Sequence, residues 1–207
     1  MNVARILYPV EVLGPGRRVG IWVAGCEHYC EKCSNPELWS KRPEYEIEVQ
    51  TLVDVIRQSI PSNQIDGFVI TGGDPFYQAE ELAELLPALK QLADDILVYT
   101  GFTYEELLSS DNEAVESCLG NISVLVDGPY IDALNDGSLL RGSSNQRIIF
   151  LNEDIKPKYQ AYFDTYHENK IQNFSVEGGV VSVGIHKRDF SDDIVAAAKK
   201  KGVVPLE

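Results

Sequence analysis

Short apolar runs alternate with segments of helical periodicity along residues 19–151. An apolar run bounded by turn residues is typical of a strand buried in a parallel sheet. The intervening segments repeat apolar residues three and four positions apart, which predicts helices that pack one face on that sheet. The strands are expected at residues 19–24, 68–70, 96–100, 122–126 and 147–151, and the helices at 51–60, 78–93 and 103–108.

The alternation of strands and helices predicts an α/β fold with a mainly parallel sheet and crossover helices. A complete barrel of eight βα units takes about 250 residues. The chain has 207 residues, so we expect an open, partial (βα) barrel. Within the helix expected at 78–93, Pro87 predicts a kink or a break. The next helix opens with the capping pattern Thr103-Tyr-Glu-Glu106.

The pattern changes after Leu151. Residues 174–185, with Glu177-Gly-Gly179 at their centre, predict a β-hairpin, and residues 191–201 predict a short helix that ends at Gly202. We therefore expect two parts. Residues 1–151 form the partial-barrel core, and residues 152–207 form a C-terminal extension packed on the core.

Polar or glycine-rich residues follow four of the predicted strands. Parallel α/β sheets place their active sites at the carboxyl ends of the strands, so these insertions are expected to meet there. They are a cysteine-rich loop after Ala24, Thr71-Gly-Gly-Asp-Pro75 after Ile70, Thr100-Gly101 after Tyr99, and Asp127-Gly-Pro-Tyr130 after Val126.

Composition and charge limit the partners. The formal net charge is −14, which argues against nucleic acid and anionic membranes, because both require a basic face. No apolar run is long enough to span a bilayer, and the N-terminal residues lack the pattern of a signal peptide. Clustered free cysteines need a reducing compartment, so we expect a cytoplasmic protein.

Three of the four cysteines lie in Cys26-Glu-His-Tyr-Cys30-Glu-Lys-Cys33. A four-iron cluster bound by three thiolates leaves one iron open for chemistry. Two alternatives remain: a structural zinc site with His28 as fourth ligand, and an electron carrier with Cys118 as fourth ligand. Cys118 lies in a segment typical of a buried helix thiol. The chain has no second cysteine cluster, so electrons are expected from outside.

The Cys-x3-Cys-x2-Cys spacing at a strand end resembles the radical S-adenosylmethionine superfamily. The element Gly72-Gly73-Asp74-Pro75 resembles that family's Gly-Gly-Glu-Pro, with aspartate in place of glutamate. The resemblance implies an enzyme in which a [4Fe–4S] cluster binds S-adenosylmethionine at its open iron. Reductive cleavage then releases a 5′-deoxyadenosyl radical.

Further segments resemble the activating enzymes of glycyl radical proteins, in particular those of anaerobic ribonucleoside-triphosphate reductase. The resemblance covers about residues 3–151. It implies hydrogen abstraction from a glycine of that large partner enzyme, with flavodoxin or ferredoxin as external electron donor. The segments are Gly14-Pro-Gly-Arg-Arg18, 98–107, 124–130 and 141–147.

The same resemblance assigns roles to individual residues. Cys26, Cys30 and Cys33 would hold the cluster. The residues expected to bind S-adenosylmethionine are Gly72, Gly73, Asp74, Thr100 and Asp127, where turn or capping roles are the alternatives for the last two. Arg141, Asn145 and Arg147 are candidates for binding a carboxylate of the partner or the cofactor.

Two other functions stay open. The C-terminal extension favours a radical enzyme that acts on a small molecule or a peptide. A non-catalytic iron–sulfur or zinc module for binding or sensing is the third hypothesis.

Overall fold

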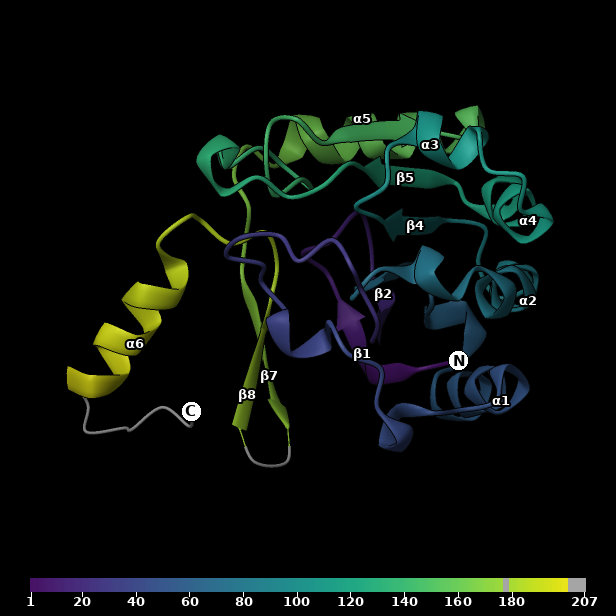
Figure 1. Ribbon diagram of the computed structural model, residues 1–207, viewed down its shortest axis with the longest axis horizontal. Helices are drawn as coiled ribbons and strands as arrows, with labels where there is room; N and C mark the ends of the chain where they lie inside the picture. Colours follow the sequence, from purple (N-terminus) through teal and green to yellow (C-terminus); the bar gives the residue numbers. More distant parts are fainter. Residues whose placement is uncertain (177–178, 201–207) are drawn as a thin grey trace.

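The computed structural model describes residues 1–176 and 179–200. A six-stranded sheet in the order β1-β2-β3-β4-β5-β6 forms its centre (Figure 1). Strands β2 to β5 are parallel, and β1 and β6 are antiparallel to β2 and β5 at the two edges. The strands are β1 (Val3–Val10), β2 (Arg18–Val23), β3 (Gly67–Gly72), β4 (Ile96–Tyr99), β5 (Val124–Asp127) and β6 (Arg147–Phe150).

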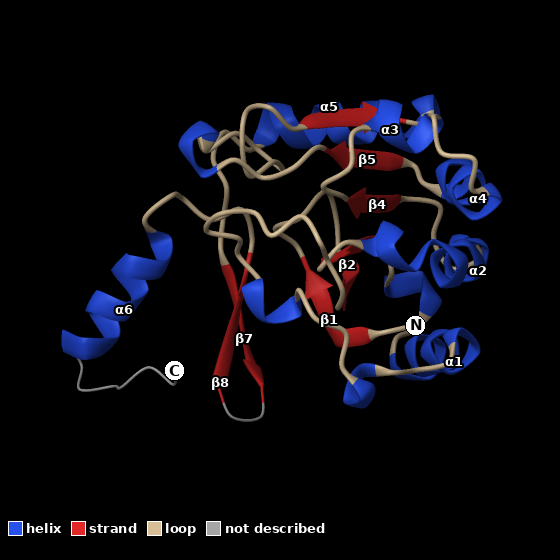
Figure 2. Ribbon diagram, viewed as in Figure 1, coloured by secondary structure: helices blue, strands red, loops and turns tan. Residues whose placement is uncertain are grey.

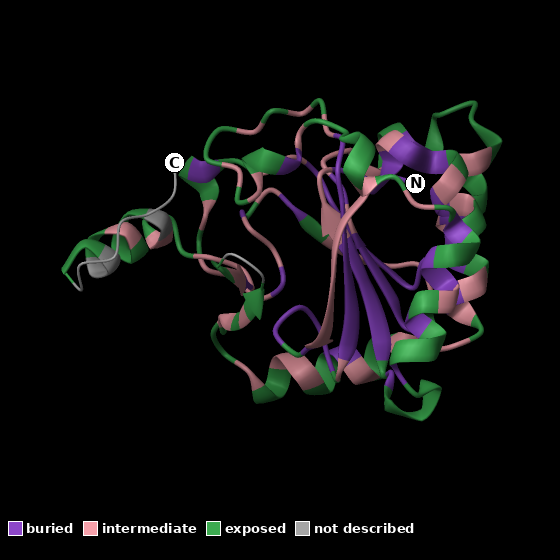
Figure 3. Ribbon diagram, turned by 90° about the horizontal axis from the view of Figure 1, so that it is seen from below, coloured by how far each residue is buried: buried purple, intermediate pink, exposed green. Residues whose placement is uncertain are grey.

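Helices and a separate hairpin cover the sheet (Figures 2 and 3). Helices α1, α2 and α4 lie on one face, and α5 and the antiparallel hairpin β7–β8 lie on the other side. The elements are α1 (Val49–Ser59), α2 (Ala79–Lys90), α3 (Tyr104–Leu108), α4 (Glu113–Asn121), α5 (Lys156–Thr165), β7 (Gln172–Val176), β8 (Gly179–Val183) and α6 (Phe190–Lys200). None of the helices in these described residues is long and apolar enough to cross a bilayer.

Neighbouring residues of each central strand enter different hydrophobic clusters, because side chains alternate across a sheet. In β2, Ile21 packs towards α1 and α2, whereas Trp22 packs on the opposite face. Tyr159 of α5 and Val183 of β8 belong to this second cluster. The C-terminal segment therefore contributes to the core of the sheet.

The strands and helices predicted between residues 19 and 151 are all present, and the sheet is mixed α/β with parallel strands at its centre. The Thr103 capping box is confirmed: the Thr103 hydroxyl accepts from the Glu106 N–H, and the Glu106 carboxylate accepts from the Thr103 N–H. Of the kink or break predicted at Pro87, the break is wrong, since α2 continues through Pro87 to Lys90. Its missing N–H falls near the end of the helix, where little of the helix depends on it.

Two elements were not predicted. Strand β1 contains Arg5 and Pro9 and is only half buried, so it lacks the apolar run of a central strand. Its place at the sheet edge tolerates a proline. Helix α5 is polar and aromatic: its core-facing side chains are Tyr159, Tyr162 and Phe163, and Pro157 lies at its first turn.

The predicted hairpin and C-terminal helix are also present. Residues 177–178 at the centre of the expected turn, and the expected helix end at Lys201 and Gly202, lie outside the described residues.

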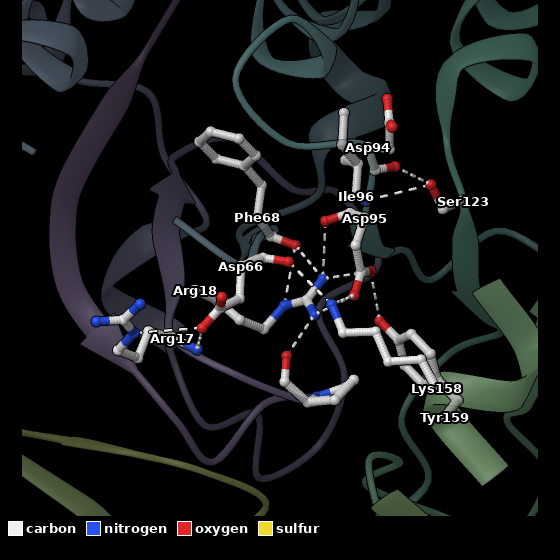
Figure 4. A network of polar contacts seen from close by, with 11 residues as sticks. Arg17, Arg18, Asp66, Phe68, Asp94, Asp95, Ile96, Ser123, Lys158 and Tyr159 are labelled. Carbon is white, nitrogen blue, oxygen red and sulfur yellow. Dashed lines mark hydrogen bonds and ion pairs between the residues drawn. The ribbon is translucent and has the colours of Figure 1, made fainter. Parts of the chain in front are cut away.

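A buried ion pair closes the amino ends of the parallel strands (Figure 4). Arg18 at the start of β2 is fully buried, and its guanidinium donates in a two-pronged arrangement to Asp95, at 2.8 and 2.9 Å. The guanidinium also donates to the carbonyl of Phe68 at 2.7 Å. From α5, the Tyr159 hydroxyl and the Lys158 amine donate to the same Asp95 carboxylate at 2.9 and 2.7 Å. The carboxylate of Asp95, the residue just before β4, thus links β4 to β2 and α5.

Burial alone would raise the pKa of Asp95, but the hydrogen bonds and charges of Arg18 and Lys158 outweigh it and hold that pKa below its usual value. The carboxylate is therefore ionised at neutral pH.

Replacing Asp95 is expected to destabilise the fold strongly. Asp95→Ala leaves the Arg18 charge buried without its partner, which costs about 3–5 kcal/mol of unfolding free energy. Urea denaturation of the apo-protein measures this. The control Asp66→Asn alters a carboxylate that pairs with Arg17 near the surface and is expected to cost about 1 kcal/mol or less. Equal losses in the two variants would contradict a special role for the buried pair.

The same pair predicts a pH dependence. Because the folded pKa of Asp95 is lowered, its stabilisation is present above the pKa of the unfolded chain, near 4. It is lost as pH falls through the lower folded pKa. In acid titrations of stability, wild type should lose more than Asp95→Asn over this range. Identical slopes would contradict the assigned linkage.

Candidate active site

The carboxyl ends of β2, β3 and β4 border a cavity of about 700 Å³. The three clustered cysteines line it together with the loops that follow β3 and β4. Most of the candidate residues are thus brought to one place; those that line the cavity are Cys26, Cys30, Cys33, Gly72, Gly73, Asp74 and Thr100.

The cysteine loop begins directly after β2 and is fixed at its base by main-chain bonds. The Gly25 and Cys26 N–H groups donate to the carbonyls of Leu38 and Trp39 at 2.8 and 2.9 Å. Within the loop, Tyr29 and Lys32 have φ values of 47° and 55°, a left-handed conformation that is uncommon for non-glycine residues. These two tight bends let the loop place all three thiols at a single cavity.

Partial burial makes the Cys26 and Cys33 thiols weaker acids than a free thiol in the absence of a ligand. It raises the pKa of Cys26 to about 11, and the Asp74 carboxylate and the other two cysteines act in the same direction. Burial also raises the pKa of Cys33. A cationic centre that binds the thiolates removes this cost, so binding releases protons.

The two glycines after β3 are needed for close packing of the backbone. A Cβ at Gly72, whose φ is +111°, would lie 2.5 Å from the carbonyl oxygen of Val23. A Cβ at Gly73 would lie 2.6 Å from the carbonyl oxygen of Gly25. The Gly73 and Asp74 N–H groups instead donate to these two carbonyls at 2.7 and 2.8 Å. The glycines therefore bring the β3 loop against the start of the cysteine loop.

The Asp74 carboxylate joins three loops at this edge. It is 1% exposed and accepts from the Phe76 N–H of its own loop at 3.0 Å. From the β4 loop, the Thr100 hydroxyl donates at 2.9 Å and the Gly101 N–H at 2.7 Å. From the cysteine loop, His28 Nε2 lies 3.0 Å away. The hydroxyl of Thr100 is thus directed to Asp74.

His28 has a structural part in the site that the sequence did not indicate. Its ring packs edge-on against Phe102 and Tyr77, with centroids at 4.7 and 5.6 Å. The space for the ring depends on Gly101, where a Cβ would lie 2.4 Å from the ring carbon. The only available signal was the position of His28 inside the cysteine loop.

Asp127 is not among the residues that line the cavity, although the adjacent Gly128 is. It is buried and accepts from the Tyr104 N–H at 2.8 Å and from the Arg147 guanidinium, which also pairs with Glu105. Arg147 thus joins β5, β6 and α3. Among the other candidates, Asn145 donates to the Pro129 carbonyl at 2.8 Å and Arg141 to the Gln146 carbonyl at 3.2 Å. These contacts shape the loops after β5.

Residues of the C-terminal segment also line the cavity, which the sequence did not predict. They include Val181, Ile185, His186, Arg188 and Phe190. The His186 ring stacks on Phe190 with centroids 4.1 Å apart. His186 is half buried: burial lowers its pKa, and its Nε2 is hidden from solvent.

Comparison with known proteins gives the class of this site. The family model described as "4Fe-4S single cluster domain" matches residues 12–149. The anaerobic ribonucleoside-triphosphate reductase-activating protein of Enterobacteria phage T4 is 35% identical over 153 residues, covering 72% of this chain and 93% of the relative. Its namesake from Escherichia coli (strain K12) is 32% identical over 149 residues, covering 67% and 92%. A pyruvate formate-lyase-activating enzyme of Staphylococcus aureus (strain USA300) is 28% identical, covering 69% and 60%.

The chain belongs to the 4Fe–4S single-cluster domain family, among activating enzymes of the radical S-adenosylmethionine type. Its cofactors are a [4Fe–4S] cluster and S-adenosylmethionine.

The residues at the cavity fit such a cluster. A [4Fe–4S] cluster takes one thiolate per iron, so its ligands surround the cluster instead of meeting at one ion. All three thiols line one cavity, where each could bind a different iron of such a cluster. Cys118 is fully buried in α4, where its thiol contacts the Ala79 carbonyl. The cavity thus presents three thiols and no fourth.

Asp74→Asn is expected to loosen the site. The amide keeps one acceptor oxygen and turns a donor towards His28 and the Gly101 N–H, so about 1–3 kcal/mol of unfolding free energy is lost. Iron content after anaerobic reconstitution should also fall, because the cysteine loop loses its contact through His28 with the Asp74 carboxylate.

Asp136→Asn is the matched control, since that carboxylate is exposed and lies 3.7 Å from Arg141. It should unfold like wild type and bind the same iron. An Asp74→Asn variant with wild-type stability and iron content would overturn the role of Asp74.

Proposed function

We propose that this protein generates a glycyl radical in a larger partner enzyme of the anaerobic ribonucleoside-triphosphate reductase type. The two relatives with that name support the choice of partner. When bound, the reduced cluster supplies one electron that splits S-adenosylmethionine into methionine and a 5′-deoxyadenosyl radical, which takes a hydrogen atom from the partner's glycine. The observation that carries the proposal is the set of three thiols at one cavity at the carboxyl edge of the sheet.

The chain's own residues hold and orient the parts. Cys26, Cys30 and Cys33 bind three irons. The backbone of Gly72 and Gly73, which packs against the start of the cysteine loop, would face the methionine moiety. Asp74 and Thr100 form the floor of this site and hold the loops in register.

The wider arrangement follows from the same proposal. The sheet serves as an open partial barrel, formed by residues 1–151, whose mouth admits a loop of the partner. Electrons come from an external donor such as flavodoxin or ferredoxin, because the remaining cysteine of these 207 residues, Cys118, is buried in α4. A reducing compartment such as the cytoplasm suits the free thiols.

One observation favours a second function. The C-terminal segment, which lies beyond the family match, lines the same cavity. A radical enzyme that acts on a small molecule or peptide would use such a wall to hold its substrate.

Electron paramagnetic resonance tests the proposed function. The reconstituted, reduced protein is mixed with S-adenosylmethionine and a purified anaerobic ribonucleotide reductase, and a glycyl radical doublet is expected together with 5′-deoxyadenosine. Formation of 5′-deoxyadenosine without any doublet would sink the proposed partner and favour the second function.

Two cysteine variants test the ligand assignment. Cys30→Ala should retain the fold but lose the cluster and all 5′-deoxyadenosine formation, because one iron loses its thiolate. Cys118 is buried elsewhere in the fold. The variant Cys118→Ala should therefore retain the cluster and form 5′-deoxyadenosine. Iron and sulfide analysis with chromatography of the nucleoside provides the measurement. Cluster-dependent cleavage by Cys30→Ala would refute the assignment.

A further inference from the structure

The C-terminal segment that lines the cavity lies outside the region shared with the family. The family match ends at residue 149, yet residues between 180 and 195 contribute to the cavity wall. In Figure 1 the hairpin and the start of α6 lie beside the loop that carries the cysteines. A segment with no counterpart in the family match thus borders the site that the family uses.

A single carboxylate ties this segment to two other parts of the site. Asp132, in the loop after β5, is 8% exposed. It accepts from Arg188 Nε at 2.8 Å and from the Tyr130 hydroxyl at 3.1 Å. The Lys32 amine, between two of the cluster cysteines, lies 3.4 Å from the same carboxylate. Asp132 therefore connects the C-terminal segment, the β5 loop and the cysteine loop.

A second contact fixes the same segment. The Asn135 amide donates to the main-chain carbonyl of His186 at 3.0 Å and to the Tyr130 hydroxyl at 3.3 Å. Beyond it, the stacked rings of His186 and Phe190 lie at the cavity. The Nε2 of His186 is buried and has no hydrogen-bond partner among the described residues. Buried polar atoms are nearly always paired, so an unpaired one at a cavity wall is expected where a bound molecule supplies the partner.

We propose that Asp132 is a positioning residue that holds residues 184–190 as a wall of the cofactor cavity, in register with the cysteine loop through Lys32. The wall restricts access to the three cluster thiols. It also narrows the entrance through which the partner's glycine loop passes, and this last part rests on the proposed function.

The charges explain why Asp132 is needed. Lys32 and Arg188 are both cationic and half exposed, and they meet at one mostly buried carboxylate. Without its negative charge the two cations repel each other, and the cysteine loop and the C-terminal segment separate. With the Asp132 charge present, each half-exposed ion pair modestly stabilises the contact between the cysteine loop and residues 184–190.

Thiol alkylation of the reduced apo-protein tests the wall directly. A bulky polyethylene-glycol maleimide is added, and the rate at each cysteine is followed by mass spectrometry. In Arg188→Ala, the rates at Cys26, Cys30 and Cys33 should rise by about two- to fivefold, the factor that one half-exposed ion pair supplies. Cys118 reports on unfolding, because it is fully buried in α4, and its rate should not change.

Lys187→Ala is the matched control. Lys187 precedes Arg188 in the chain and also lines the cavity, but in the described part of the chain only Arg188 of the two pairs with a carboxylate. Its removal should leave all rates at the wild-type value. Equal rates in Arg188→Ala and Lys187→Ala would overturn the proposal.

Asp132→Asn and the double variant complete a cycle. If the two residues act through one contact, the double variant should alkylate no faster than the faster single variant. Multiplied effects would overturn the coupling. Should Asp132→Asn also expose Cys118, the decision rests on Arg188→Ala, which removes only a half-exposed side chain.

The experiment separates this proposal from the proposed function. Alkylation requires neither the cluster nor the partner. If Arg188→Ala leaves the alkylation rates unchanged while the wild-type enzyme forms the glycyl radical, the proposed wall is refuted and the proposed function is retained. If Arg188→Ala raises the alkylation rates but the wild-type protein forms no glycyl radical, the wall is supported and the proposed function is refuted.

Discussion

The carboxylate of Asp74 is the contact on which the active-site edge depends. Three loops leave the carboxyl ends of β2, β3 and β4 in different directions, and each supplies a partner to this buried group: His28, the Phe76 N–H, and Thr100 with Gly101. A buried carboxylate is tolerated only with such partners. The need to satisfy one charge thus determines where the cysteine loop lies relative to the glycines of the β3 loop.

At the amino ends of the parallel strands, a buried charge is again satisfied by polar partners from several elements. Arg18 and Asp95 are buried at the amino ends of the strands, and Lys158 and Tyr159 of α5 complete the network (Figure 4). Strong packing and a buried ion pair hold this end, so the loops at the other end carry the chemistry on a rigid base. Arg18, which looks like a family marker in the sequence, therefore supports the fold and lies at the opposite end of β2 from the cysteine loop.

Much of the core could be predicted because its signals are local. Apolar runs gave β2 to β6, glycine and polar insertions gave the strand ends, and the cysteine spacing gave the cofactor class confirmed by the family match. Strand β1 and helix α5 were not predicted, because their position at the sheet edge and their tertiary contacts determine them more than a periodic pattern of aliphatic residues does. The partnership of His28 with Asp74 and that of Asp132 with Arg188 join residues 46 and 56 positions apart. No local pattern encodes such pairs. The contact of Asp127 with Arg147, on the next strand, is another pair of this kind, and the assignment of Asp127 to the cofactor stays a prediction.

Three cysteine ligands would leave one iron of the cluster open to S-adenosylmethionine. Electron–nuclear double resonance on the reduced cluster, with the methionine amino and carboxylate groups isotopically labelled, detects such an open iron. Couplings from both groups to the cluster are expected in wild type and in Cys118→Ala. A fully loaded cluster whose spectrum lacks any coupling would rule out the open iron.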